Sequence, residues 1–127
     1  MKKYLVLCAL VPSLAAGTRG FSPDPDLGAG AEIYRRCCAL CHGTNGEGAA
    51  GPNLADEYWL YGASFKDVFR STKYGIPPKG MIPWKGTLNN KELRNVTAYV
   101  LSLAGTNPPG AKGPEGKKYD GQSAKGK

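Results

Sequence analysis

The sequence predicts an all-α fold, with three main helices and one short helix separated by irregular loops. Three observations support this. Helix-capping residues or apolar stripes at helical spacing mark residues 26–38, 64–75 and 89–105. No segment alternates apolar and polar residues as a half-buried strand does. The intervening loops 43–53 and 75–87 are rich in Gly and Pro, which interrupt regular structure.

Residues 1–20 have the composition of a secretory signal peptide. A Lys pair precedes an apolar run from Tyr4 to Leu14, and small residues follow at positions 15–17, where we expect cleavage. An apolar run of about twelve residues is too short for a hydrocarbon core, which takes roughly twenty. An uncleaved anchor is left open as an alternative.

The net charge of +7 is concentrated at the two ends of the chain. Residues 21–104 hold nine basic and eight acidic side chains, so the middle has no basic stripe and nucleic-acid binding is excluded. Residues 106–127 contain no Leu, Ile, Val, Met, Phe or Trp. We predict a flexible tail there, because it cannot bury enough apolar surface to offset the entropy of ordering. Its lysines keep it solvated, and a docking role is the alternative.

The main chemical signature lies in RRCCALCHGTNGEG, residues 35–48, which holds three of the four cysteines and the only histidine. Cys38, Cys41 and His42 form Cys-x-x-Cys-His, the attachment pattern of c-type haem. Two thiols one helical turn apart can each add to a vinyl group of the porphyrin, and the next residue projects an imidazole at the iron. We therefore predict one covalent haem c per chain, attached through Cys38 and Cys41, with His42 as an axial ligand.

Two other readings of the cysteine cluster fit less well. A structural zinc site needs four ligands, usually in two Cys/His pairs, and the chain has no second histidine. A thioredoxin-like dithiol would follow a strand in a βαβ pattern, which is missing. The Gly-x-Gly-x-x-Gly match at residues 46–51 is rejected for the same reason. Cys37 is expected to be a buried or half-buried free thiol, and its role stays open.

The three main helices begin at recognisable caps. Asp26 is the N-cap candidate of the first helix, which runs directly into the haem motif. Ser64 with Asp67, and Asn89 with Glu92, have the spacing of capping boxes at the starts of the second and third helices. A shorter helix is expected around the segment DEYWLYG.

Met81 is the candidate for the second axial position on the iron. It is the only methionine besides the initiator, and it lies in the loop PPKGMIPW before the third helix. Met with His is a standard ligand pair of cytochromes c. Prolines on both sides stiffen the backbone that would aim the sulfur. The alternative is that Met81 fills a gap in the core.

With these motifs the chain resembles class I cytochromes c. More narrowly, it is similar to the C-terminal monohaem domain of the diheme subunit III of cbb3-type cytochrome c oxidases. The resemblance covers roughly residues 28–105 and rests on CALCHGTNGEG, GPNLADEYWLYG, KYGIPPKGMIPW and ELRNVTAYVLSLAG. It implies a class I cytochrome c fold over residues 21–105, in which the three main helices and the short one wrap around a covalent haem.

The resemblance also implies roles for particular residues. Pro52 would lie beside the imidazole, its carbonyl orienting His42. The haem pocket would be lined by Leu54, Trp59, Ile76 and Trp84, for each of which ordinary core packing is the alternative. The first and last helices would cross at Gly30 and Tyr34 on one side and Val96 and Tyr99 on the other.

These inferences together predict an electron-transfer protein rather than an enzyme. It would be periplasmic, either soluble or at the outer face of the inner membrane. By resemblance, the donor would be a quinol-oxidising complex and the acceptor a haem-copper oxidase, of which the chain could be a subunit. A haem-based peroxidase or gas sensor is the alternative and requires a displaceable Met81; a redox-inactive structural subunit is a third reading. Peripheral membrane association and the oligomeric state stay open.

Overall fold

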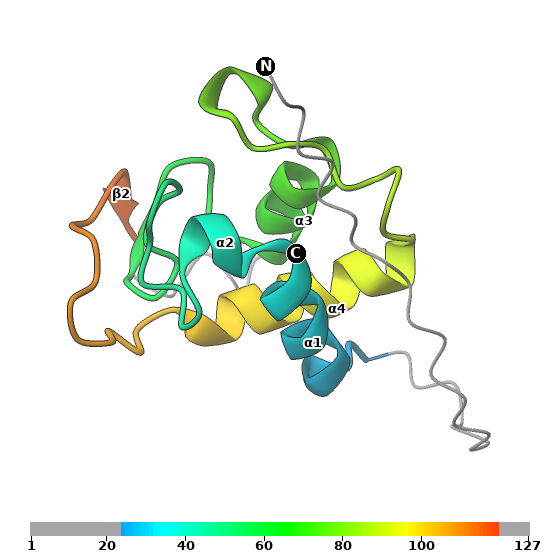
Figure 1. The fold of residues 1–127 in the computed structure, drawn as a ribbon, viewed down its shortest axis with the longest axis horizontal. Coiled ribbons are helices and arrows are strands. Elements are labelled where there is room, and N and C mark those ends of the chain that lie inside the picture. The colour runs from blue at the N-terminus through cyan, green and yellow to red at the C-terminus, as the bar shows by residue number, and fades with distance from the viewer. Residues whose placement is uncertain (1–23, 120–127) are drawn as a thin grey trace.

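The computed structural model describes residues 24–119, so the predicted signal peptide and residues 120–127 lie outside it. In this range the chain forms helices α1 (Leu27–Cys37), α2 (Ala39–His42), α3 (Phe65–Tyr74) and α4 (Asn90–Leu103), the short 3-10 helix η1 (Pro77–Lys79), and the two-residue strands β1 (Tyr58–Trp59) and β2 (Lys117–Lys118) (Figure 1). The predicted all-α fold is confirmed, and each main helix ends within two residues of its expected bounds. No helix between residues 24 and 119 is both long and apolar enough to cross a membrane.

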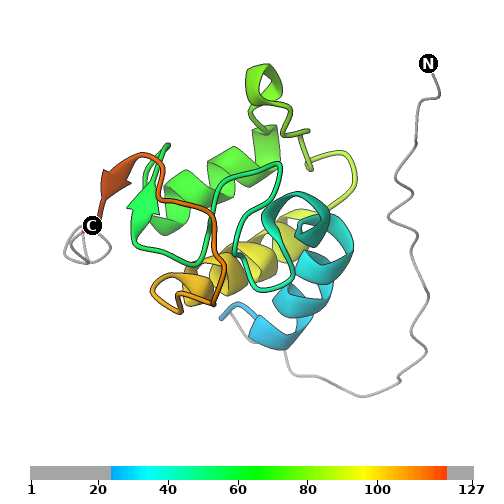
Figure 2. The same cartoon turned by 60° about the vertical axis from the view of Figure 1, so that its left-hand side comes forward.

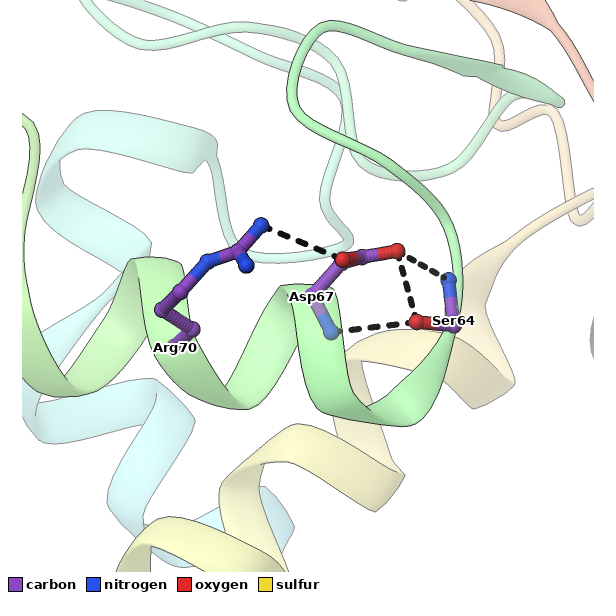
Figure 3. A network of polar contacts seen from close by, with 3 residues as sticks. All are labelled: Ser64, Asp67 and Arg70. Carbon is purple, nitrogen blue, oxygen red and sulfur yellow. Dashed lines mark hydrogen bonds and ion pairs between the residues drawn. The ribbon is translucent and has the colours of Figure 1, made fainter. Parts of the chain in front are cut away.

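Capping boxes fix the starts of α3 and α4, as predicted. The Ser64 hydroxyl accepts a hydrogen bond from the Asp67 N–H at 3.1 Å and donates to Asp67 Oδ2 at 2.6 Å, while the Ser64 N–H reaches the same oxygen at 3.3 Å (Figure 3). Arg70 pairs with the other oxygen of Asp67 at 3.2 Å. Asn89 and Glu92 make the equivalent reciprocal bonds at 3.0 and 2.8 Å. Both helices therefore begin with their first free N–H groups satisfied.

Helices α1 and α4 cross in close contact, as Figures 1 and 2 show. Gly30 lies at the crossing, where a Cβ atom would overlap the backbone carbonyl of Asn95 and lie 2.9 Å from the Cβ of Tyr99. Tyr34 is fully buried, with its ring centroid 5.3 Å from that of Tyr99. Asp26 caps α1, and its own N–H donates to Asn95 Oδ1 at 2.9 Å. The expected crossing at Gly30 and Tyr34 is confirmed.

The core lies where α1, α3 and α4 meet, with the loop after η1 closing one side. Helix α4 packs against both α1 and α3. The apolar stripe expected within residues 89–105 is buried, because Leu93, Val96, Val100 and Leu103 recur at intervals of three or four residues and share one face. The buried cluster consists of Ile33, Tyr34, Val68, Trp84, Leu88, Leu93, Val96, Val100 and Leu103.

The short helix expected at residues 56–62 does not form. The side chain of Asp56 accepts a hydrogen bond from the Tyr58 N–H at 2.9 Å, a local turn that competes with helical backbone bonding. The next two residues form β1, and Tyr58 and Trp59 pair in antiparallel register with Lys118 and Lys117. The short helix of this fold is instead α2, within the haem motif.

The flexible tail expected at residues 106–127 does not hold for residues 107–119, which we call the C-terminal strap. The strap runs along the loop between α2 and α3, coloured orange to red in Figure 2. Besides the β1–β2 pairing, three backbone N–H groups of the strap donate to that loop: Asn107 to Ala55 at 3.0 Å, Lys112 to Glu47 at 2.8 Å, and Tyr119 to Glu57 at 2.8 Å. These backbone hydrogen bonds hold the strap in place. The expectation of a flexible tail considered only the burial of apolar side chains, so it did not include them.

Candidate functional site

The Cys-x-x-Cys-His motif lies at the junction of α1 and α2. The Cys38 N–H bonds to the Tyr34 carbonyl at 2.9 Å and ends α1, while the His42 N–H bonds to the Cys38 carbonyl at 3.0 Å within α2. Cys38 packs against the core, and Cys41 is exposed. Both thiols are free, and the short helix sets them one turn apart with His42 next in line. This arrangement fits two thioether bonds to one edge of a haem.

The three neighbouring cysteines differ in state. Burial, reinforced by the charge of Cys41, raises the pKa of the Cys38 thiol to about 12, so this thiol is neutral at physiological pH. Cys37 is disulfide-bonded, whereas the thiols of Cys38 and Cys41 are both free. The expectation of a free Cys37 thiol is therefore wrong, because burial alone does not determine whether a thiol is oxidised.

The imidazole of His42 is fixed by a backbone carbonyl. Its Nδ1 lies 2.9 Å from the carbonyl oxygen of Pro52. A carbonyl only accepts hydrogen bonds, so Nδ1 carries the proton and Nε2 is left with a lone pair for a metal. Burial also lowers the pKa of His42, which favours the neutral, ligating form. The contact that the resemblance implied between Pro52 and His42 is present.

The loop after α2 is folded tightly against the motif. The Gly48 N–H donates to the His42 carbonyl and the Gly51 N–H to the Cys41 carbonyl, both at 2.7 Å. A Cβ atom at Gly51 would lie 2.8 Å from the imidazole carbon Cε1 of His42. The backbone thus touches the edge of the histidine ring, and a side chain at this position would displace it.

Met81 lies on a separate loop that is closed on itself and anchored to α3. Ile76 and Met81 exchange two backbone hydrogen bonds, at 2.9 and 3.3 Å, around the turn formed by η1. Gly75, with φ of +67°, allows the chain to enter this turn. The Trp84 N–H donates to the Thr72 carbonyl of α3 at 3.2 Å. Met81 is half-buried and packs against the core, so its position is fixed by the fold.

The four residues expected to line a haem pocket are all at least partly buried. Trp84 belongs to the core, Leu54 and Trp59 pack against it, and Ile76 pairs with Met81. Whether each would contact haem stays a prediction. Two surface hollows of about 350 and 600 Å³ share Trp59, Ala63 and Tyr119, and neither is lined by Cys38, His42 or Met81. Between residues 24 and 119, no group of three or more His, Cys, Asp or Glu could hold a metal ion.

Sequence reasoning missed two residues beside the histidine loop. Asn53 directly follows Pro52 and is buried, with its side-chain oxygen accepting from the Ala55 N–H at 2.7 Å and its amide donating to the Lys112 carbonyl at 2.9 Å. Lys112 of the strap approaches the same loop from outside. Asn53 follows the Gly-Pro pair, a turn signal that could have drawn attention to it. No local pattern marks Lys112.

Comparisons with known proteins agree with this geometry. Residues 25–100 match the family model described as cytochrome c oxidase, cbb3-type, subunit III. A cbb3-type cytochrome c oxidase subunit CcoP of Azospirillum sp. (strain B510) is 36% identical over 105 residues, which cover 72% of this chain and 36% of the relative. Cytochrome cL of Methylophaga aminisulfidivorans has a TM-score of 0.57 at 32% identity, covering 60% of this chain and 53% of that one. Cytochrome cL of Hyphomicrobium denitrificans has a TM-score of 0.55 at 34% identity, covering 58% and 45%.

The fold and the motif therefore define a class I c-type cytochrome, which carries covalently bound haem c. The free thiols of Cys38 and Cys41 and the free nitrogen of His42 fit that group. The chain belongs to the family of the cbb3-type cytochrome c oxidase subunit III. It spans about a third of the length of the curated relatives that it matches.

Proposed function

We propose that the chain transfers single electrons, with haem attached at Cys38 and Cys41 and its iron held between His42 and Met81. The observation that carries this proposal is the hydrogen bond from His42 Nδ1 to the Pro52 carbonyl, which leaves Nε2 free to bind iron. When bound, haem supplies a one-electron ferric/ferrous couple.

The chain's own residues would hold and shield that couple. Pro52 fixes the orientation of the imidazole, and the bridge between Ile76 and Met81 holds the loop that presents the thioether. Trp84 and Leu54 would exclude water from the buried side. If His42 and Met81 both bound the iron, each would do so from ordered backbone, and a change of oxidation state would then require little rearrangement of the chain, which suits a carrier rather than a catalyst.

The partners and location are part of the proposal. The matching relatives are named as subunits of cbb3-type cytochrome c oxidases, which supports a haem-copper oxidase as the acceptor or as the complex to which the chain belongs. A quinol-oxidising complex as donor rests on the family resemblance alone. The signal-like residues 1–20 support a periplasmic location, soluble or at the outer face of the inner membrane. Covalent c-type haem is consistent with export.

Replacing Met81 separates a carrier from a catalyst or sensor. Met81→Ala should abolish the weak sulfur-to-iron charge-transfer band of the ferric protein, lower the reduction potential and open the ferrous iron to carbon monoxide. Ile82→Ala is the matched control, because Ile82 neighbours Met81 and is 54% exposed. Ready carbon monoxide binding by the unmodified ferrous protein at neutral pH would instead support the peroxidase or sensor alternative.

The attachment residues are tested by denaturing extraction. In the unmodified protein, acid-acetone treatment should leave the pigment with the polypeptide, because two thioether bonds hold it. Cys38→Ser and Cys41→Ser should each remove one of these bonds, whereas Cys37→Ser should retain the pigment. Loss of covalent haem in the Cys37 variant would mean that the attachment residues are assigned wrongly.

A further inference from the structure

The strap holds one residue, Lys112, directly against the loop that orients His42. The Lys112 N–H donates to the Glu47 carbonyl at 2.8 Å, and the Lys112 carbonyl accepts from the buried amide of Asn53 at 2.9 Å. The backbone of Lys112 is thus bonded on both sides to the loop around Pro52. A Cβ atom at Gly48 would lie 2.9 Å from the Cβ of Lys112, so the two segments touch without a gap.

The side chain of Lys112 then points back toward the histidine loop. Its Nζ lies 3.5 Å from the carbonyl oxygen of Gly51, the residue whose backbone touches the imidazole of His42. It also pairs with Glu115 of the strap at 3.0 Å. An exposed ion pair such as Lys112–Glu115 adds little to the stability of the fold. Its importance here is that it helps to set where the charge of Lys112 lies.

From this placement we infer that Lys112 tunes the haem from the proximal side, with its charge raising the reduction potential and Asn53 holding it in place. This inference rests on the proposed function, because it requires iron at His42. Reduction would add one electron to the iron. A fixed positive charge is repelled more by ferric than by ferrous iron, so it favours the reduced state.

Glu115 moderates this effect. Its carboxylate is the negative partner of Lys112, so neutralising it leaves the lysine charge uncompensated near the loop. The other carboxylate in the region, Glu47, accepts from the Asn45 N–H at 2.7 Å and belongs to the loop itself. The two strap residues therefore predict shifts of opposite sign, which a loss of folding would not produce for both. A general effect of net charge would also give opposite signs, so a charge removed elsewhere on the surface, at Lys117, is the control for it.

The test is a spectroelectrochemical titration of the full-length, haem-loaded protein at low ionic strength. Lys112→Gln should lower the ferrous-to-ferric ratio at a fixed potential by about two- to fivefold, or about 20–40 mV, since tenfold is about 59 mV for one electron. Lys112→Arg should retain the potential, and Glu115→Gln should raise it. Lys117→Gln, an identical charge change at an exposed position of β2, should leave it near that of the unmodified protein. Added salt should shrink the shifts.

Two results would overturn the inference. One is that Lys112→Gln and Lys117→Gln have the same reduction potential. The other is that Glu115→Gln has a lower reduction potential than the unmodified protein. Failure of the proposed function looks different, because the unmodified protein would then lack the sulfur-to-iron band and bind carbon monoxide. If the reduction potential of Lys112→Gln is unchanged while the sulfur-to-iron band is intact, the role of Lys112 is refuted but the proposed function is not.

Discussion

The crossing of α1 and α4 at Gly30 offers a sharp test, since a single added methyl group there should destabilise the protein. At Gly30, an added Cβ would overlap the Asn95 carbonyl of α4 and press on Tyr99. In an unconstrained helix, Gly→Ala favours folding by about 1 kcal/mol. At Gly30 that gain is opposed by overpacking, typically about 1–3 kcal/mol and here near the upper end because the overlapped atoms belong to backbone. We therefore expect Gly30→Ala to lower the free energy of unfolding by about 2 kcal/mol.

The assay is thermal unfolding of the haem-loaded protein, followed by helical circular dichroism. For a domain of this size, about 2 kcal/mol corresponds to a fall in Tm of roughly 8–16 °C. Gly28→Ala is the matched control, because Gly28 lies on the same helix, is exposed, and a Cβ there meets only Asp26 Oδ1 at 3.3 Å. It should leave Tm unchanged or raise it slightly. A Gly30 variant as stable as the Gly28 variant would refute the crossing of α1 and α4 described above.

The remaining predictions concern α3 and the strap. Ser64→Ala should lower the free energy of unfolding by about 1 kcal/mol at neutral pH. The Ser64 hydrogen bond lowers the pKa of Asp67, so its stabilisation of the folded state is complete above pH about 4 and is lost as the pH falls further. The loss of stability caused by Ser64→Ala, measured by chemical unfolding, should therefore shrink in acid. A loss that is the same at all pH values would contradict this role of Ser64. Asn53→Ala should cost about 1–3 kcal/mol and speed amide exchange at Lys112, since it unpairs buried groups, whereas the exposed Asn45→Ala should cost nothing measurable. Equal losses in the two variants would show that Asn53 does not anchor the strap.

Features that depend on residues within one or two helical turns of each other could be predicted from the sequence. The spacing of Cys38, Cys41 and His42 predicted the haem motif, and Ser64 with Asp67 predicted the start of α3. Such signals are local because a capping bond or a helical turn joins residues three or four positions apart, whatever the rest of the fold does. The resemblance to a known family added the crossing at Gly30 and the carbonyl of Pro52.

Only the tertiary structure decided what depends on segments far apart in the chain. Residues 107–119 have too few apolar side chains to suggest order, yet their backbone groups find partners some sixty positions earlier, as Lys112 does at Asn53. The same pairing makes β1 at Tyr58 a strand and not a helix. Backbone N–H and C=O groups are identical in every residue, so composition cannot indicate which of them will meet. The sequence thus determines the haem motif of this protein, and the fold determines which distant segments, such as the strap at Lys112, lie against the loop beside it.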